Sequence, residues 1–216
     1  MPPSGGRGPV SSLRAAYDRT MSQLSLLGDD EHPPQPTDRL FFAVMPDAAT
    51  AARIAAQAEH LKRTLGLKGR LIEADRLHVT LHHVGDHPGF PPGLVEQAQQ
   101  AGAALKAVPF DVAFERAESF AGRPRNRPFV LRGEGLAPLI AFQQALGLQM
   151  ARAGLGRWVD GRFTPHVTLA YDDLLVPATP IEPIGWRIDE LVLVHSLLGR
   201  HRHEVLGRWR LAAAAA

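Results

Sequence analysis

The stretches LHVTLHHV (77–84) and PHVTLAYD (165–172) decide the fold, because each contains the tetrapeptide His-Val-Thr-Leu. The second copy begins 88 residues after the first. Alternating β-branched and apolar residues are typical of strands. A predicted strand and a predicted helix precede each copy, so the order of strand, helix and motif strand occurs twice. We interpret this as an internal duplication that builds two lobes related by an approximate twofold axis.

The residues before the first copy predict a strand followed by a helix. LFFAVM (40–45) is a short apolar run closed by Pro46-Asp47, as expected of a buried strand that gives way to a helix start. Residues 48–65 carry apolar side chains near helical spacing, and Gly66 is placed to end that helix.

The rest of the chain continues with alternating helical and strand patterns. The predicted elements are helices over 94–106 and 136–153, and strands over 111–120, 127–133, 187–198 and 203–211. A Pro-rich connection precedes the last two strands, which we expect to pair as a hairpin through GRHR (199–202). The predicted class is α+β, with two pseudo-symmetric lobes, each an antiparallel-rich sheet with helices on its outer face, and a central cleft.

The two ends of the chain differ in composition from this patterned part. Residues 1–37 are rich in Pro, Gly, Ser and charge, so we expect a flexible N-terminal tail, within which Met21 offers a second plausible start. Residues 38–211 form the predicted bilobal domain, and residues 212–216 a disordered end.

Composition limits the available chemistry. The 216 residues are 45% hydrophobic and carry a formal net charge of +2, which suits a globular protein with a sizeable core. The absence of cysteine excludes disulfides and thiolate zinc sites. No apolar run approaches the roughly 20 residues that span a bilayer, so we expect a soluble cytoplasmic protein without membrane contact.

The motif strands place reactive groups on one face. Side chains alternate along a strand, so His78 and Thr80 point one way while Val79 and Leu81 point the other, and the second motif repeats this pattern. If the twofold axis brings the strands together, two imidazoles and two hydroxyls converge on a space about the size of one phosphate. In-line displacement at phosphorus then has a base for water, an acid for the leaving oxygen and donors for the non-bridging oxygens.

Other candidates depend on the same alternation. His82 shares a face with His78 and is predicted to line the cleft rim, whereas His83 is predicted to face the lobe interior. Of Phe41 and Phe42, only one can reach the cleft. Phe42 is the candidate for stacking on a nucleobase, with core packing as the alternative.

Two further groups of residues invite other interpretations. The histidines suggest a metal site, yet no His-Glu-x-x-His helix accompanies them, and we expect no metal and no other cofactor. The basic loop over 121–126 is either a contact for RNA phosphates or an ordinary solvated loop. Arg76, two residues before His78, is a weaker cleft-edge candidate.

With these motifs in hand, the chain resembles the two-histidine phosphoesterases, and within them the RNA 2′,3′-cyclic phosphodiesterases known as the 2′-5′ RNA ligase family. The resemblance covers nearly all of 39–211 and rests on the following stretches: RLFFAVMPD, LHVTLHHVGD, FTPHVTLAYDD, ELVLVHSLLG and HEVLGRWRL. It implies a metal-independent hydrolase that opens a ribose 2′,3′-cyclic phosphate to a 2′-phosphate. His78 would be the general acid, His166 the general base, and Thr80 and Thr168 the phosphate-binding residues.

The chain departs from this family pattern at one position. Many relatives have an arginine where this sequence has Tyr171, a further candidate for the cleft, and the alternative cations considered are Arg123, Arg125, Arg127 and Arg162. The expected partners are RNA ends or nucleotides with a 2′,3′-cyclic phosphate, bound by a monomer. The alternatives are 2′-5′ RNA ligation in the same cleft and a non-catalytic protein that binds RNA ends.

Overall fold

Each motif strand lies at the edge of a four-stranded antiparallel sheet in the computed structural model, which describes residues 34–121 and 126–212. The first sheet has the order β2-β1-β7-β8, with β1 (Asp38–Val44), β2 (Val79–His87), β7 (Glu190–Leu197) and β8 (Arg202–Arg210). The second has the order β5-β4-β3-β6, with β3 (Phe110–Ser119), β4 (Arg127–Arg132), β5 (Val167–Asp172) and β6 (Thr179–Ile188). The predicted α+β class and the two-lobed arrangement are confirmed.

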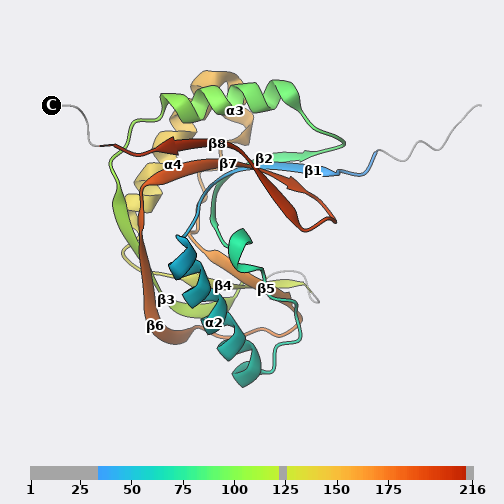
Figure 1. Ribbon diagram of the computed structural model, residues 1–216, viewed down its shortest axis with the longest axis vertical. Helices are drawn as coiled ribbons and strands as arrows, with labels where there is room; N and C mark the ends of the chain where they lie inside the picture. Colours follow the sequence, from blue (N-terminus) through green and yellow to red (C-terminus); the bar gives the residue numbers. More distant parts are fainter. Residues whose placement is uncertain (1–33, 122–125, 213–216) are drawn as a thin grey trace, which may run out of the picture. The chain divides into compact units, whose positions relative to one another are not determined.

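The helices are exchanged between the lobes (Figure 1). Helix α2 (Ala48–Leu65) connects β1 to β2 of the first sheet but packs against β6 of the second. Helix α4 (Ala137–Met150) connects β4 to β5 of the second sheet, yet it lies with α3 (Pro92–Ala104) on the side of the first sheet. Each lobe therefore packs against a helix that comes from the sequence repeat of the other lobe. The two lobes together belong to one compact unit, which spans residues 36–216.

Local sequence signals explain where α2 begins and ends. The side chain of Asp47 accepts a hydrogen bond from the Thr50 amide at 2.8 Å, which satisfies a donor that the first helical turn leaves free. Gly66 ends the helix in the left-handed conformation, with φ of 72°. The predicted helix over 48–65 is confirmed at both ends.

Helix α3 approaches the first sheet very closely. A Cβ atom on Gly102 would lie 2.7 Å from ring atoms of Trp209 in β8, so only glycine fits at this helix position. Trp209 in turn packs against Phe42 of β1, with 6.2 Å between ring centroids. This contact fixes α3 on the face of the sheet that carries Phe42.

Strand β6 was not predicted from the sequence. Its segment contains Pro180 and Pro183, and this composition indicated a Pro-rich connection instead. Proline cannot donate to a sheet ladder, but it is tolerated on an edge strand, and β6 is the edge strand beside β3. The predicted hairpin of β7 and β8 is confirmed by their antiparallel pairing.

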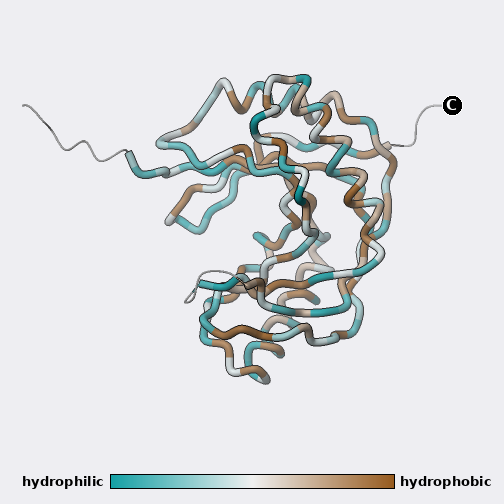
Figure 2. Tube along the Cα trace, turned by 180° about the vertical axis from the view of Figure 1, so that it is seen from behind, coloured by the Kyte–Doolittle hydropathy of each residue, from teal (hydrophilic) through white to brown (hydrophobic). Residues whose placement is uncertain are grey.

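The ends of the chain are described only in part. Most of the predicted tail, the predicted residues 213–216 of the C-terminal end and residues 122–125 of the basic loop lie outside the described residues. Thr37 precedes β1 and is hydrogen-bonded to both neighbouring segments, because its amide donates to the His87 carbonyl at 2.9 Å and its carbonyl accepts from the Leu198 amide at 2.8 Å. Across the described ranges, no helix is both long enough and apolar enough to cross a bilayer. Figure 2 shows hydrophilic and hydrophobic positions interspersed along the elements.

Candidate active site

A cavity of about 510 Å³ lies between the two motif strands. The side chains of His78 and Thr80 from one lobe and of His166 and Thr168 from the other all line it. The remaining lining residues are Arg39, Phe41, Ile72, Arg76, His83, Tyr171, Ser196, Leu197, Leu198, Gly199, His201 and His203. The structure thus brings both predicted His-x-Thr pairs to one space.

Both histidines are held by the same backbone contact. The Nδ1 atom of His78 lies 2.7 Å from the carbonyl oxygen of Arg76, and the Nδ1 atom of His166 lies 2.7 Å from that of Thr164. A carbonyl oxygen only accepts, so each Nδ1 must carry the proton and donate it. In the neutral state each Nε2 therefore keeps its lone pair. Each ring is locked in the tautomer that can take up or release a proton at Nε2.

A β-bulge interrupts each motif strand at the same place. In the first sheet Ala43 pairs with Thr80 and Phe42 with His82, so Leu81 is the extra residue. In the second sheet Val130 pairs with Thr168 and Phe129 with Ala170, so Leu169 is the extra residue. A bulge shifts the alternation of side chains by one position. The residues after the bulge therefore face opposite to the direction that simple alternation predicts.

This shift corrects two predictions on β2. His82, predicted to line the cleft rim, is only 3% exposed, and its Nε2 donates to the backbone carbonyl of Gln143 in α4 at 2.9 Å. His83, predicted to face the lobe interior, lines the cavity. On β5 the same shift buries Ala170 and brings Tyr171 to the cavity, where it is 45% exposed. His83 and Tyr171 therefore occupy matching positions in the two lobes.

Of the two interpretations of Phe42, the structure contradicts stacking on a ligand and confirms core packing. Its side chain is 0% exposed and belongs to the core between the first sheet and α3. Full burial of a phenylalanine contributes about 1.5 to 3 kcal/mol to stability, so this ring is not available to a ligand. Phe41 is the aromatic residue of β1 that lines the cavity, and its ring stacks on His78 with 4.9 Å between centroids.

A third histidine stands beside His78. The ring of His203, from β8, meets His78 edge to face at 5.5 Å and Phe41 at 5.6 Å. Burial lowers the pKa of His203 to about 4, and the charges of His78 and Arg76 act in the same direction. His203 is therefore neutral near pH 7. No local sequence pattern indicates this contact, because β8 reaches β2 only through β7 and β1.

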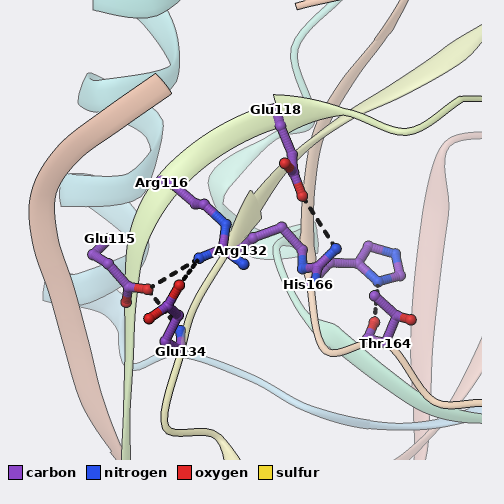
Figure 3. A network of polar contacts seen from close by, with 7 residues as sticks. All are labelled: Glu115, Arg116, Glu118, Arg132, Glu134, Thr164 and His166. Atoms are coloured by element: carbon purple, nitrogen blue, oxygen red, sulfur yellow. Dashed lines mark hydrogen bonds and ion pairs between the residues drawn. The ribbon is translucent and has the colours of Figure 1, made fainter. Parts of the chain in front are cut away.

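The surroundings of His166 are different (Figure 3). Its ring lies edge to face against Phe120 at 4.9 Å, and Arg132 lies nearby with an ion pair to Glu118 at 3.1 Å. Glu118 is the ion-pair partner of Arg132 in this region. The Thr164 carbonyl holds His166 from the other side.

The pKa values of both catalytic candidates, His78 and His166, are lowered. Burial lowers the pKa of His78 to about 4, helped by the charges of His166 and Arg76 and opposed by the hydrogen bond to the Arg76 carbonyl. Burial also lowers the pKa of His166, with the charge of Arg132 acting in the same direction. Near pH 7 both His78 and His166 are therefore neutral in the free protein. An anionic ligand would raise both pKa values and favour uptake of a proton.

Comparison with known proteins identifies the family to which this pair of motifs belongs. The family model described as the 2′-5′ RNA ligase superfamily matches residues 49–200. The chain belongs to this superfamily of two-histidine phosphoesterases. No curated protein matches it at a significant level.

Solved structures agree with this assignment. The crystal structure of a phosphoesterase is 26% identical, with a TM-score of 0.64 over 83% of this chain and 100% of the other. Escherichia coli LigT in its apo form is 27% identical, with a TM-score of 0.63 over 83% of this chain and 99% of LigT. TT0787 of Thermus thermophilus, at 23% identity and a TM-score of 0.59 over 80% and 97% of the two chains, shares the fold.

Four arginines were candidates to replace the arginine that many relatives have at the position of Tyr171. The two that the structure describes do not line the cavity. Arg127 donates to the backbone carbonyl of Asp173, and Arg162 is 96% exposed beside Asp160. Arg123 and Arg125 lie outside the described residues. Within the described ranges, no three His, Asp or Glu side chains gather as a metal site.

Proposed function

We propose that this chain hydrolyses RNA 2′,3′-cyclic phosphate ends to 2′-phosphates by acid and base catalysis with His78 and His166. The observation that carries the proposal is the matched pair of Nδ1 contacts at 2.7 Å beside one cavity. These contacts leave two Nε2 atoms, one from each lobe, free to act on the same phosphate. One must start neutral and the other protonated.

The reaction needs these two states in one displacement. His166, as the base, takes a proton from water at its Nε2 while the water oxygen attacks phosphorus. The bond from phosphorus to O3′ breaks, and His78, as the acid, donates its Nε2 proton to that oxygen. The hydroxyls of Thr80 and Thr168 donate to the non-bridging oxygens, where negative charge accumulates. The proton has then passed from His78 to His166 by way of the substrate, and exchange with solvent restores the starting state.

The complexes of a relative support a nucleotide substrate. Structures of Escherichia coli LigT have been solved with ATP, with 3′-AMP and with phosphate. The cavity of about 510 Å³ has room for a nucleotide, with aromatic Phe41 and Tyr171 on its walls. We expect a cytoplasmic monomer that acts on RNA ends without a metal or other cofactor.

The name of the superfamily points to a second reaction in the same cleft. An RNA 5′-hydroxyl in place of water would give a 2′-5′ linkage through the same proton transfers: His166 would take the proton of the 5′-hydroxyl, and His78 would donate a proton to the departing O3′. We expect hydrolysis to dominate because water is the more abundant nucleophile. A protein that only binds RNA ends would need neither histidine to be free at Nε2.

The test is to incubate the protein with a short RNA that ends in a 2′,3′-cyclic phosphate and to identify the product by ³¹P NMR. We expect a 2′-phosphomonoester, formed equally well with excess chelator and at least about 10²-fold more slowly by the His166→Ala variant. A 3′-phosphomonoester would refute the assignment of the leaving oxygen. Ligated RNA in the presence of a 5′-hydroxyl strand would favour the ligase, and binding without any product would favour the non-catalytic alternative.

A further inference from the structure

The cavity has two arginines on its wall, and they differ in how their charges are compensated. Arg39 makes a two-pronged contact with Asp86, with both nitrogen to oxygen distances at 2.7 Å. This ion pair holds the guanidinium of Arg39 and neutralises it.

Arg76 has no such partner within the part of the chain that the structure describes. Its side chain makes no ion pair there, and its Nε is buried without a hydrogen bond. Leaving a buried donor of a charged group unpaired is costly, so such a group is expected to have a partner in the working state of the protein. The unpaired donor belongs to a side chain that lines the cleft.

Arg76 lies at the end of the segment 67–76, which connects α2 to β2 and is held against the second motif strand, β5. The Lys68 and Gly69 amides both donate to the Asp172 carboxylate at 2.6 Å. A Cβ atom on Gly69 would lie 2.1 Å from the carbonyl oxygen of Tyr171, so this approach requires glycine. Farther along, the Ile72 amide donates to the Leu169 carbonyl at 2.7 Å.

The short helix η1 (Ala74–Arg76) then leads directly into β2. The segment therefore runs from β5 to β2, and Arg76 lies where it meets the first motif strand. Its backbone carbonyl already orients His78.

We propose that the Arg76 guanidinium binds the non-bridging oxygens of the phosphate and is the uncompensated arginine among the described residues that line this cleft, an inference that rests on the proposed function. A guanidinium can donate two parallel N–H bonds to two phosphate oxygens, and its positive charge compensates the negative charge of the phosphate. Arg76 would then orient the phosphate between the two Nε2 atoms, while its carbonyl holds one of them in the active tautomer.

The test compares Arg76→Gln and Arg76→Lys with Arg70→Gln. Arg70 is a matched control because it lies on the same segment, is exposed, pairs with Glu73 and does not line the cavity. Titration calorimetry with inorganic phosphate should show about 10- to 100-fold weaker binding for Arg76→Gln and an intermediate loss for Arg76→Lys. Arg70→Gln should bind like the wild type.

A second measurement separates a phosphate contact from a structural role. The charge of Arg76 lowers the pKa of His78, so an NMR titration should find a higher His78 pKa in Arg76→Gln and the wild-type value in Arg70→Gln. Circular dichroism should find the same fold in all variants, because the substitutions leave the Arg76 carbonyl in place.

The outcomes also separate this inference from the proposed function. Wild-type phosphate affinity in Arg76→Gln would overturn the role of Arg76, even if turnover of cyclic phosphate persists. A wild-type protein that fails to bind millimolar phosphate would overturn it as well. If the wild type turns over no cyclic phosphate but Arg76→Gln still loses phosphate affinity, the proposed function fails and the anion site stands.

Discussion

The two motif strands share their geometry and differ in their surroundings. In both, the histidine Nδ1 donates to the carbonyl two residues earlier at 2.7 Å, and a bulge follows the threonine. His78, however, lies against Phe41 and His203, whereas His166 lies against Phe120 and near Arg132, which forms an ion pair with Glu118. The reactive unit is thus the same in the two lobes, while its surroundings differ. Two histidines with the same local geometry can therefore take different roles.

The largest expected effect comes from removing either histidine. His78→Ala and His166→Ala should each lower turnover of a 2′,3′-cyclic nucleotide by at least about 10²- to 10⁴-fold, because each supplies one of two required proton transfers. Circular dichroism should show an unchanged fold. A variant that retains near-wild-type turnover would show that its histidine is structural and that the two lobes are not functionally matched.

Substitution of the two motif threonines tests the same comparison of the lobes, with a smaller expected loss of activity. Thr80→Val and Thr168→Val keep the shape of the side chain and remove the hydroxyl donor, so each should lower kcat by roughly 10- to 100-fold. Thr179→Val is the control, since that hydroxyl donates to the Pro177 carbonyl and does not line the cavity. Equal activity of Thr80→Val and the control would remove Thr80 from the phosphate site.

The pH dependence of kcat/KM should reveal the depressed pKa values. His78 titrates near pH 4 in the free protein, and the pKa of His166 also lies below 6.5. The active form carries one proton on the two histidines together. It is most populated at a pH between the two pKa values of the pair, which both lie below 6.5. We therefore expect an optimum below pH 6.5 and a loss of about tenfold per pH unit above the higher value. An optimum above pH 7 would contradict the lowered pKa values of the two histidines.

The smallest expected effects test the bulge. His82→Ala gives β2 the residue that β5 has at the matching position, and it removes a buried ring together with its bond to Gln143. It should lower the free energy of unfolding by about 1 to 3 kcal/mol with little change in turnover. His83→Ala should raise KM with little change in stability, because its side chain is 48% exposed at the cavity. Chemical denaturation and steady-state kinetics would be measured on both variants. If β2 had no bulge, His82→Ala would raise KM and His83→Ala would lower the free energy of unfolding.

Sequence patterns predicted the elements well because most of them carry local signals. The Asp47 and Gly66 caps define α2, and the alternation in 203–211 predicts β8 to within one residue. Strand β6 was missed because its prolines resemble those of a loop, and only its position at a sheet edge makes them acceptable.

The site was predictable only in part. The His-x-Thr pairs repeat in the sequence, so their shared cavity could be expected. The bulge could not be read from β2 alone. An alignment of the two motifs offers one signal. Ala170 of the second motif aligns with His82 of the first, and a small apolar residue there indicates that the position is buried. The neighbours of His78 that come from β1 and β8, Phe41 and His203, depend on tertiary structure and leave no local pattern.

The most direct test of the paired mechanism is a double-mutant cycle on the two histidines. Turnover of a 2′,3′-cyclic nucleotide would be measured for the wild type, for His78→Ala, for His166→Ala and for the double variant. Because acid and base act in one displacement, the double variant should lose far less activity than the product of the two single losses, and it should resemble either single variant. Losses that multiply would show that the two histidines act independently, which would contradict the paired mechanism.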